Sequence, residues 1–200
     1  QIPLTAVYLE LAAYACATTF SPGPNNILLL SSTSRFGLRK CWPLIFGIWG
    51  GLVAIMLLCG FGCAWLGELV PQIIPVAKYV GAAYILYLAY RTFVRSPGGQ
   101  DTDKASRPLT CVNGFLLQFL NVKILMLGIA AYSGYILPTG FSVPAVLCFA
   151  LIMAACAGTG NLIWATAGTL LLPLYKRHYK LVNGVMALLL LWCAWTIVTL

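Results

Sequence analysis

Six long apolar segments constrain this chain more than any other feature of its sequence. They lie at about 4–30, 42–66, 74–94, 109–132, 143–172 and 181–200. A hydrocarbon core of about 30 Å needs roughly 20 apolar helical residues to cross it. The chain is also 61% hydrophobic and only 8% charged, so it lacks the polar surface that a soluble domain of this length needs. The sequence therefore predicts an all-α membrane protein with six transmembrane helices.

The basic residues are concentrated in alternate loops between these segments. Ten of the twelve flank the first, third and fifth loops: Arg35, Arg39, Lys40, Arg91, Arg95, Lys104, Arg107, Lys176, Arg177 and Lys180. Loops rich in Lys and Arg stay on the cytoplasmic side of a membrane, so we expect both termini to be extracytoplasmic. The net charge of +8 then orients the chain and attracts anionic lipid headgroups. It does not predict a nucleic-acid partner.

A polar stretch at 96–108, SPGGQDTDKASRP, separates two groups of three segments. Because three is an odd number, the two groups must cross the membrane in opposite senses. GGLVA in the second segment can be aligned with GNLIW in the fifth, which is weak support for an internal repeat. We expect a single transporter domain over 1–200, built as a 3+3 inverted repeat, a plan that recurs among secondary transporters. The half-repeats would be about 1–95 and 109–200, joined by a cytoplasmic linker at 96–108.

The motif SPGPNN interrupts the first apolar segment. Pro22 and Pro24 have no backbone N–H and clash with the preceding turn. Broken backbone is tolerated inside a membrane only where it is buried in protein or lines a wet cavity. A simple proline kink is the alternative, but a kink does not require Gly23, Asn25 and Asn26 as well. We therefore predict that the first helix breaks at Pro22-Gly23-Pro24 and restarts there, so that its N–H groups favour a carboxylate and the carbonyls before it favour an ammonium group.

The fourth segment contains the matching motif QFLNVK, which ends at Lys123. A Lys at the centre of a bilayer costs about 2.5–3.5 kcal/mol on insertion scales, and from this depth its stem would have to reach half the hydrocarbon thickness to snorkel. A functional Lys is therefore the better interpretation. In a regular helix Gln118 and Asn121 share a face, whereas Asn121 and Lys123 point about 200° apart. These two residues can line one cavity only if the helix loosens between them.

Asn161 lies in the fifth segment, beside Gly158 and Gly160. Small residues let membrane helices approach closely, and an Asn among them can hydrogen-bond to a neighbouring helix. Such a structural bond and a contact with a ligand are equally compatible with the sequence.

The four acidic residues are all expected outside the membrane interior. Glu10 and Glu68 fall near the outer rim, and Asp101 and Asp103 fall in the inner loop. A cationic substrate side chain would therefore find no counter-charge, so we expect a substrate that is neutral overall. If transport is coupled to protons, no buried carboxylate can carry them, and Lys123 is the candidate.

Other classes of function find little support in the sequence. An enzyme needs a nucleophile with a base or a metal cluster, and the single His178 has no acid at suitable spacing. Cys59 and Cys63 share a helix face, which is compatible with a soft metal, but no His or acid accompanies them and packing is the simpler interpretation. A metal permease or channel would need inward acids or rings of carbonyls, and a buried Lys disfavours it. We expect no cofactor and no catalytic residues.

The quoted motifs also resemble a known family. PGPNNILLLSS, a basic loop, a Gly-rich second segment and FLNVKI are similar to the lysine-exporter (LysE/RhtB) family of bacterial amino-acid exporters over essentially the whole chain. GAAYI and LQFLNVKI are most similar to the branch that exports cysteine and O-acetylserine. The resemblance implies a secondary exporter of small neutral amino acids in the bacterial cytoplasmic membrane, with homoserine or threonine as alternative substrates. It leaves open whether the protein forms a homo-oligomer.

The chain departs from the family pattern at two positions. Many members have an acid after the glycine of the second segment, where this chain has Gly51, and many have Asn-Pro-Lys where this chain has Asn121-Val122-Lys123. The second departure weakens the expectation of a full break in the fourth helix. The predicted substrate-binding residues are Pro22, Gly23, Pro24, Asn25, Asn26, Gln118, Asn121, Lys123 and Asn161.

Overall fold

A computed structural model describes residues 19–20, 22–66, 70–94, 108–140 and 142–199. All regular structure in these ranges is helical, which confirms the all-α prediction for this part of the chain. The α-helices are α2 (Pro24–Phe36), α3 (Leu38–Leu66), α4 (Val70–Val94), α5 (Cys111–Leu120), α6 (Val122–Ala131), α7 (Val143–Leu170) and α8 (Leu172–Thr199). A π-helix, η2 (Tyr132–Ile136), and a 3₁₀ turn, η3 (Leu137–Thr139), follow α6.

Three helices in the described ranges are long and apolar enough to cross a membrane, at 38–65, 143–170 and 172–199. The pair α5 and α6, continued by η2 and bent by 60°, makes a fourth when it is taken as one span. These correspond to four of the six predicted segments. The third predicted segment is covered by α4, a helix of 25 residues, and the first falls largely outside the described residues. The six-span arrangement therefore stays a prediction.

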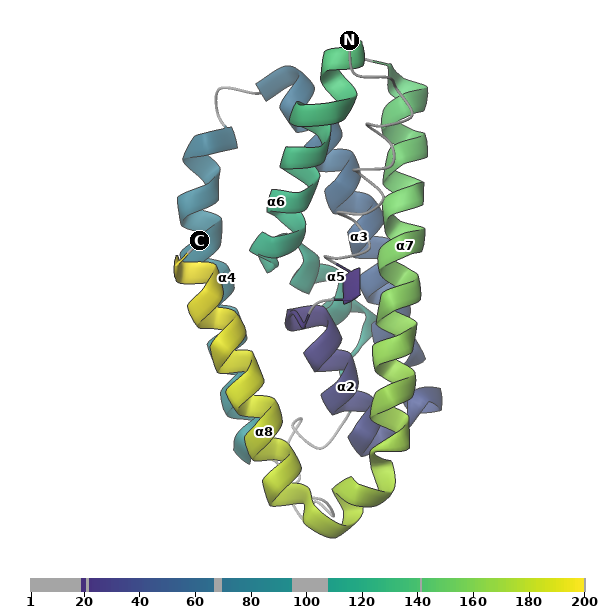
Figure 1. The fold of residues 1–200 in the computed structure, drawn as a ribbon, viewed down its shortest axis with the longest axis vertical. Helices are drawn as coiled ribbons and strands as arrows, with labels where there is room; N and C mark the ends of the chain where they lie inside the picture. The colour runs from purple at the N-terminus through teal and green to yellow at the C-terminus, as the bar shows by residue number, and fades with distance from the viewer. Residues whose placement is uncertain (1–18, 21, 67–69, 95–107, 141, 200) are drawn as a thin grey trace.

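The helices form two long pairs with shorter helices between them (Figure 1). In one pair α3 lies beside α7, and in the other α4 lies beside α8. Between the pairs, α2 packs on α7 and α8, and α5 packs on α3. The starts of α2 and α6 consequently meet near mid-height, inside the bundle (Figure 1).

Close approach of the helices depends on glycine at two of these interfaces. A Cβ at Gly47 of α3 would collide with the carbonyl oxygen of Cys111 in α5, and a Cβ at Gly168 of α7 would collide with the carbonyl oxygen of Leu30 in α2. Because lipid supplies no hydrophobic drive between helices, such close packing is a main source of association in membranes.

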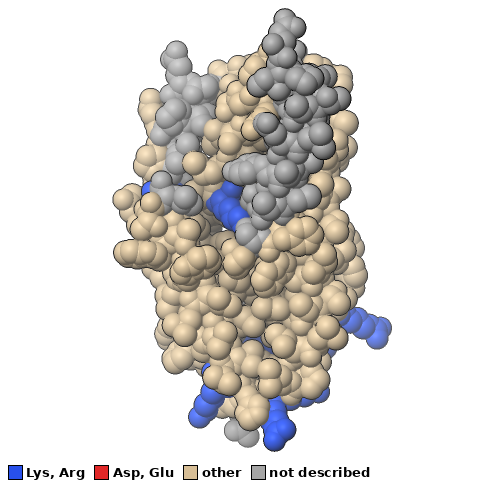
Figure 2. Space-filling view, viewed as in Figure 1, with Lys and Arg blue, Asp and Glu red and all other residues tan. Residues whose placement is uncertain are grey.

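Large apolar side chains remain on the outside of the bundle. Trp65, Leu170, Leu181 and Trp195 are each between 66% and 77% exposed. A monomeric soluble protein rarely presents so much apolar surface, whereas lipid solvates it. Most of the basic side chains visible in Figure 2 lie toward the lower end of the molecule, where α7 joins α8, and basic atoms also show in a recess at mid-height.

The last helix is not regular along its whole length. His178 has φ −134° and ψ 47°, which lies outside the helical region. The first turns of α8 and its longer apolar part therefore meet at a kink, in agreement with the sixth predicted segment, which begins at 181.

Candidate functional site

The helix α2 begins at Pro24, directly after the non-helical Pro22 and Gly23. Gly23 is extended (φ −152°, ψ 171°), and no side chain caps the helix. Proline at the first helical position loses nothing, because its missing N–H would have no acceptor there. The first N–H groups of any α-helix have no acceptor within the helix itself. Thr19 and Phe20 before the interruption are helical, and Ser21 lies outside the described residues.

A second helix start lies at Val122, where α5 ends and α6 begins at an angle of 60°. The residue between them, Asn121, has φ −86° and ψ 87°. Its N–H donates to the Gln118 carbonyl at 3.3 Å, and its own carbonyl accepts from the N–H groups of Ile124 and Leu125 at 3.0 and 3.1 Å. The expectation that valine in place of proline would weaken this break is therefore wrong, because Asn121 closes one helix and opens the next.

Buried amide side chains connect the two helix starts. Asn25 Nδ2 donates to Gln118 Oε1 at 2.7 Å, and Gln118 Nε2 donates back to Asn25 Oδ1 at 3.1 Å. Asn121 Nδ2 donates to the same Asn25 oxygen at 3.2 Å. Gln118 also donates to the Gly114 carbonyl at 3.0 Å. The three bonds that involve Asn25 join α2 to α5 and to the start of α6, and the bond to Gly114 holds Gln118 in place within α5.

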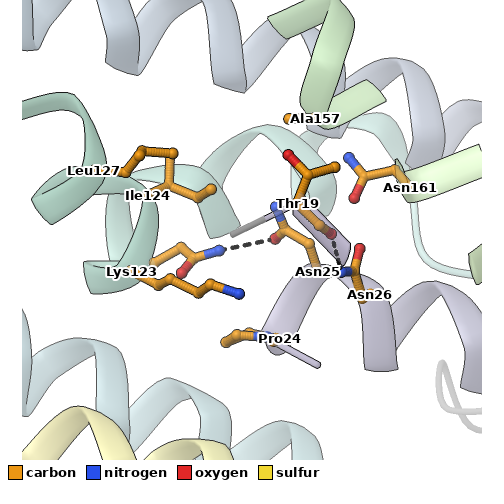
Figure 3. A pocket seen from close by; sticks show the side chains of 11 residues that line it. Thr19, Pro24, Asn25, Asn26, Lys123, Ile124, Leu127, Ala157 and Asn161 are labelled. Atoms are coloured by element: carbon orange, nitrogen blue, oxygen red, sulfur yellow. Dashed lines mark hydrogen bonds between the residues drawn. The ribbon is translucent and has the colours of Figure 1, made fainter. Parts of the chain in front are cut away.

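Asn26 makes a more local connection. Its Nδ2 donates to the Thr19 carbonyl at 2.8 Å (Figure 3), which joins the two sides of the interruption at Pro22 and Gly23. The freed carbonyl of a broken helix is thus satisfied within the protein, as a membrane interior requires.

The side chain of Lys123 extends from the start of α6 toward the start of α2. A Cβ built on Gly23 would lie 3.1 Å from Lys123 Nζ and 3.4 Å from its Cδ, so the glycine makes room for the ammonium group. The four acidic residues of the sequence, Glu10, Glu68, Asp101 and Asp103, all lie outside the described residues.

Two buried polar atoms at this point have no hydrogen-bond partner among the described residues: Asn121 Oδ1, an acceptor, and Asn161 Nδ2, a donor. Asn121 is 1% exposed and Asn161 is 4% exposed. A buried polar group that lacks its partner costs about 1–3 kcal/mol. A ligand that supplied one donor and one acceptor would remove that cost.

These side chains surround a cavity of about 30 Å³, and Figure 3 shows Asn25, Asn26, Lys123 and Asn161 converging on it from three helices. Its lining residues are Thr19, Gly23, Pro24, Asn25, Asn26, Asn121, Lys123, Ile124, Leu127, Ala157 and Asn161. About 10–15 Å³ suffices for one water, so the cavity has room for water and is too small for an amino acid.

Seven of the nine predicted site residues line this cavity. Pro22 lines an adjoining cavity instead, and Gln118 is fully buried behind Asn25, to which it is bonded. The sequence interpretation missed Thr19, Ile124, Leu127 and Ala157. The last three are apolar and give no functional signal, and only the packing of the helices brings Thr19 to the cavity. It also missed the wall that α8 contributes to the adjoining cavity, namely Trp192, Cys193, Thr196 and Ile197. Cys193, Thr196 and Ile197 have the i, i+3 and i+4 spacing of one helix face. The sequence therefore indicates that they share a face of α8, but it does not indicate which part of the protein that face contacts.

The thiols form no obvious metal site in the ranges that the structure covers, where no group of three or more His, Cys, Asp and Glu side chains could hold an ion. Cys59 Sγ lies 3.9 Å from the Leu125 carbonyl, within reach of a weak hydrogen bond.

The chain belongs to the family described as LysE type translocator, which matches residues 16–199. Family membership and the long apolar helices identify a multi-pass membrane protein of a transporter family, in agreement with the expectation that it is not an enzyme.

Among its relatives are proteins named cysteine/O-acetylserine efflux protein from Escherichia coli K12, Escherichia coli O139:H28 and Shigella flexneri. Each is 36% identical over 181 residues, which cover 90% of this chain and 92% of the relative. No solved structure matches the chain.

Proposed function

We propose that this protein is a secondary exporter that moves small neutral amino acids, cysteine and O-acetylserine first, from the cytoplasm across the bacterial inner membrane. Membership of a translocator family and the names of the relatives support the direction and the substrate class. The observation that carries the proposal is the meeting of two helix starts at a buried cavity, where one acceptor and one donor have no hydrogen-bond partner among the described residues.

The proposed architecture is a single domain of six spans arranged as a 3+3 inverted repeat. In it the first helix is broken at Pro22-Gly23-Pro24 and its second half is α2, as α6 is the second half of the fourth helix. The pairing of α3 with α7 and of α4 with α8 supports the repeat, because each pair joins helices that hold the same position in the two proposed halves. The half-repeats are about 1–95 and 109–200, with the cytoplasmic linker at 96–108.

In the proposed complex the substrate carboxylate binds at the starts of α2 and α6, where N–H groups and helix dipoles favour an anion. Lys123 Nζ adds a positive charge, and Asn161 Nδ2 donates a further hydrogen bond. The ammonium group donates to Asn121 Oδ1 and to carbonyls around Ser21–Gly23. Because the four acidic residues are expected outside the membrane interior from their positions in the sequence, a cationic side chain would find no counter-charge.

Transport requires the site to open, because the cavity of about 30 Å³ holds water and not an amino acid. We place the basic end of the bundle in the cytoplasm and both termini outside, following the distribution of Lys and Arg. Rocking of one three-helix half against the other would then expose the site to each side in turn. Lys123 is the proposed proton carrier if export is coupled to a proton gradient.

The proposal is tested by reconstituting the purified protein in liposomes and measuring transport of labelled cysteine, O-acetylserine and threonine. The variants are Asn161→Ala and Lys123→Met, and the matched controls are Thr159→Ala, an exposed neighbour on α7, and Lys180→Met, an exposed basic residue on α8. We expect cysteine and O-acetylserine to be transported faster than threonine, with both site variants impaired and both controls unchanged.

Three results would contradict parts of the proposal. Flux no higher than in empty liposomes removes the exporter function, and flux that favours threonine or homoserine replaces the substrate. Equal flux in the wild type and both site variants leaves the function but removes the site. For coupling, transport that still follows an imposed pH gradient in Lys123→Met excludes Lys123 as the proton carrier.

A further inference from the structure

A second cavity adjoins the first and is much larger. It has a volume of about 240 Å³ and shares Gly23, Pro24 and Lys123 with the cavity between the asparagines. Its remaining lining residues are Pro22 and, on α8, Trp192, Cys193, Thr196 and Ile197. The start of α2 and the side chain of Lys123 therefore stand between two spaces, of which one is polar and narrow and the other is wide.

The two cavities suit different parts of an amino acid. The narrow one, at about 30 Å³, has four Asn side chains and Lys123 among its lining residues, so it suits a small charged group. The wide one has room for many heavy atoms, since about 10–15 Å³ already holds a water. Among the described residues that line it, Lys123 is the charged one. A cationic side chain would be repelled by that ammonium group, whereas an uncharged side chain would not be.

The wall on α8 adds two weakly polar groups to a mainly apolar surface, the Cys193 thiol and the Thr196 hydroxyl. Thr196 Oγ1 donates its proton to the Trp192 carbonyl at 2.9 Å, so the hydroxyl oxygen is left as an acceptor. Cys193 is 4% exposed. Such a wall tolerates a thiol or an ester, because both are small, uncharged and only moderately polar.

We propose that the cavity between the start of α2 and α8 is the side-chain pocket of the exporter, and that Cys193 and Thr196 determine which side chains it accepts. This inference rests on the proposed function. The substrate lies across both cavities, with its carboxylate near Lys123 and its side chain directed toward α8. The sequence alone assigns no such role to the last helix.

The test compares the export of two substrates that differ in side-chain size. Thr196→Leu fills part of the pocket and removes the hydroxyl. Thr199→Leu is the matched control, because Thr199 is exposed, lines neither cavity, and makes the same bond to the carbonyl four residues earlier, at 3.0 Å. We expect the ratio of O-acetylserine to cysteine transport in liposomes to fall about tenfold in Thr196→Leu, since pockets discriminate about this strongly by size. The ratio should be unchanged in Thr199→Leu.

A binding assay keeps the inference testable when a variant transports poorly. In a variant whose only cysteine is Cys193, O-acetylserine at about twice its Kd or above should slow alkylation of the thiol by N-ethylmaleimide at least about threefold, because protection follows 1 + [L]/Kd. In a variant whose only cysteine is the exposed Cys148, it should have no effect.

An unchanged transport ratio in both Thr196→Leu and Cys193→Leu overturns the pocket, and so does alkylation of Cys193 at the same rate with and without O-acetylserine. Either result leaves the exporter function intact as long as the wild type transports the two substrates. Absence of wild-type transport, by contrast, removes the proposed function itself.

Discussion

The helix α2 starts after Pro22, Gly23 and Pro24, whereas α6 starts at Val122 with neither proline nor glycine between Phe115 and Leu127. The first interruption follows from covalent structure, because proline lacks the donor that a continuous helix needs. The second depends on Asn121, whose side chain donates to Asn25 across the bundle while its backbone serves both helices. A new helix start inside the bundle can thus be produced locally by residue type or remotely by packing. Four predictions test this difference.

Lys123→Met should have the largest effect, because its ammonium group lies where the two starts meet. Losing a hydrogen bond to a charged group costs about 1.5–3 kcal/mol, so we expect transport of cysteine in liposomes to fall about 100-fold. Lys180→Met, with the same chemical change at an exposed position, should transport normally. Near-normal transport by Lys123→Met would show that the ammonium group at the meeting point of the two helix starts has no role in transport.

Asn25→Ala should destabilise the protein more than Asn26→Ala, because Asn25 bonds to Gln118 of α5 and to Asn121 across the bundle, whereas the bond from Asn26 to the Thr19 carbonyl stays within the first segment. We expect losses of about 2–3 kcal/mol and about 1 kcal/mol in the free energy of unfolding, since a buried group that loses its partner costs about 1–3 kcal/mol. Unfolding in mixed detergent micelles measures both. Equal losses of stability in the two variants would show that the start of α6 does not depend on its hydrogen bond to Asn25 at the start of α2.

Gly23→Ala should impair transport by about tenfold and leave the fold in place. The added methyl would lie 3.1 Å from Lys123 Nζ, so the flexible end of that side chain must move, and crowding of this kind costs about 1–3 kcal/mol. Gly62→Ala is the control, because a Cβ there meets nothing within 4 Å. If both variants transport like the wild type, the position of Lys123 against the start of α2 is not important.

Val122→Pro should have the smallest effect. Val122 is the first residue of α6, where proline is tolerated, and Asn121 before it already has the non-helical ψ of 87° that a residue preceding proline favours. We expect the free energy of unfolding to change by less than about 1 kcal/mol. Leu117→Pro, inside α5, should cost about 3 kcal/mol or more, and similar losses for the two variants would argue that α6 does not begin at Val122.

Much of the site could be predicted because its residues are unusual for a membrane interior. Pro22, Pro24 and Lys123 are costly in lipid wherever they occur, so their position in apolar segments already indicates a function. Asn25 and Asn26 could be assigned to the site but not to their partners. Their hydrogen bonds to Gln118 and Thr19 depend on distances between helices, which residue types do not encode.

The break at Asn121 and the wall on α8 could not be predicted for a related reason. Asn is compatible with a regular membrane helix, and only a neighbour such as Asn25 makes the broken form preferable. Cys193 and Thr196 are ordinary residues of an apolar helix, and their role depends on what α8 packs against.

The sequence by itself determined that the chain is solvated by lipid, because it has six long apolar segments. It also determined where residues that are costly in lipid occur, namely the prolines that interrupt the first segment and the cation deep in the fourth. Those properties follow from transfer free energies and backbone chemistry, which act residue by residue. Only the tertiary structure decided that the second helix start forms without proline, that the two starts share one cavity, and that α8 closes a second cavity beside it. The physical reason is that hydrogen bonds and packing between helices depend on relative position, which no single segment specifies.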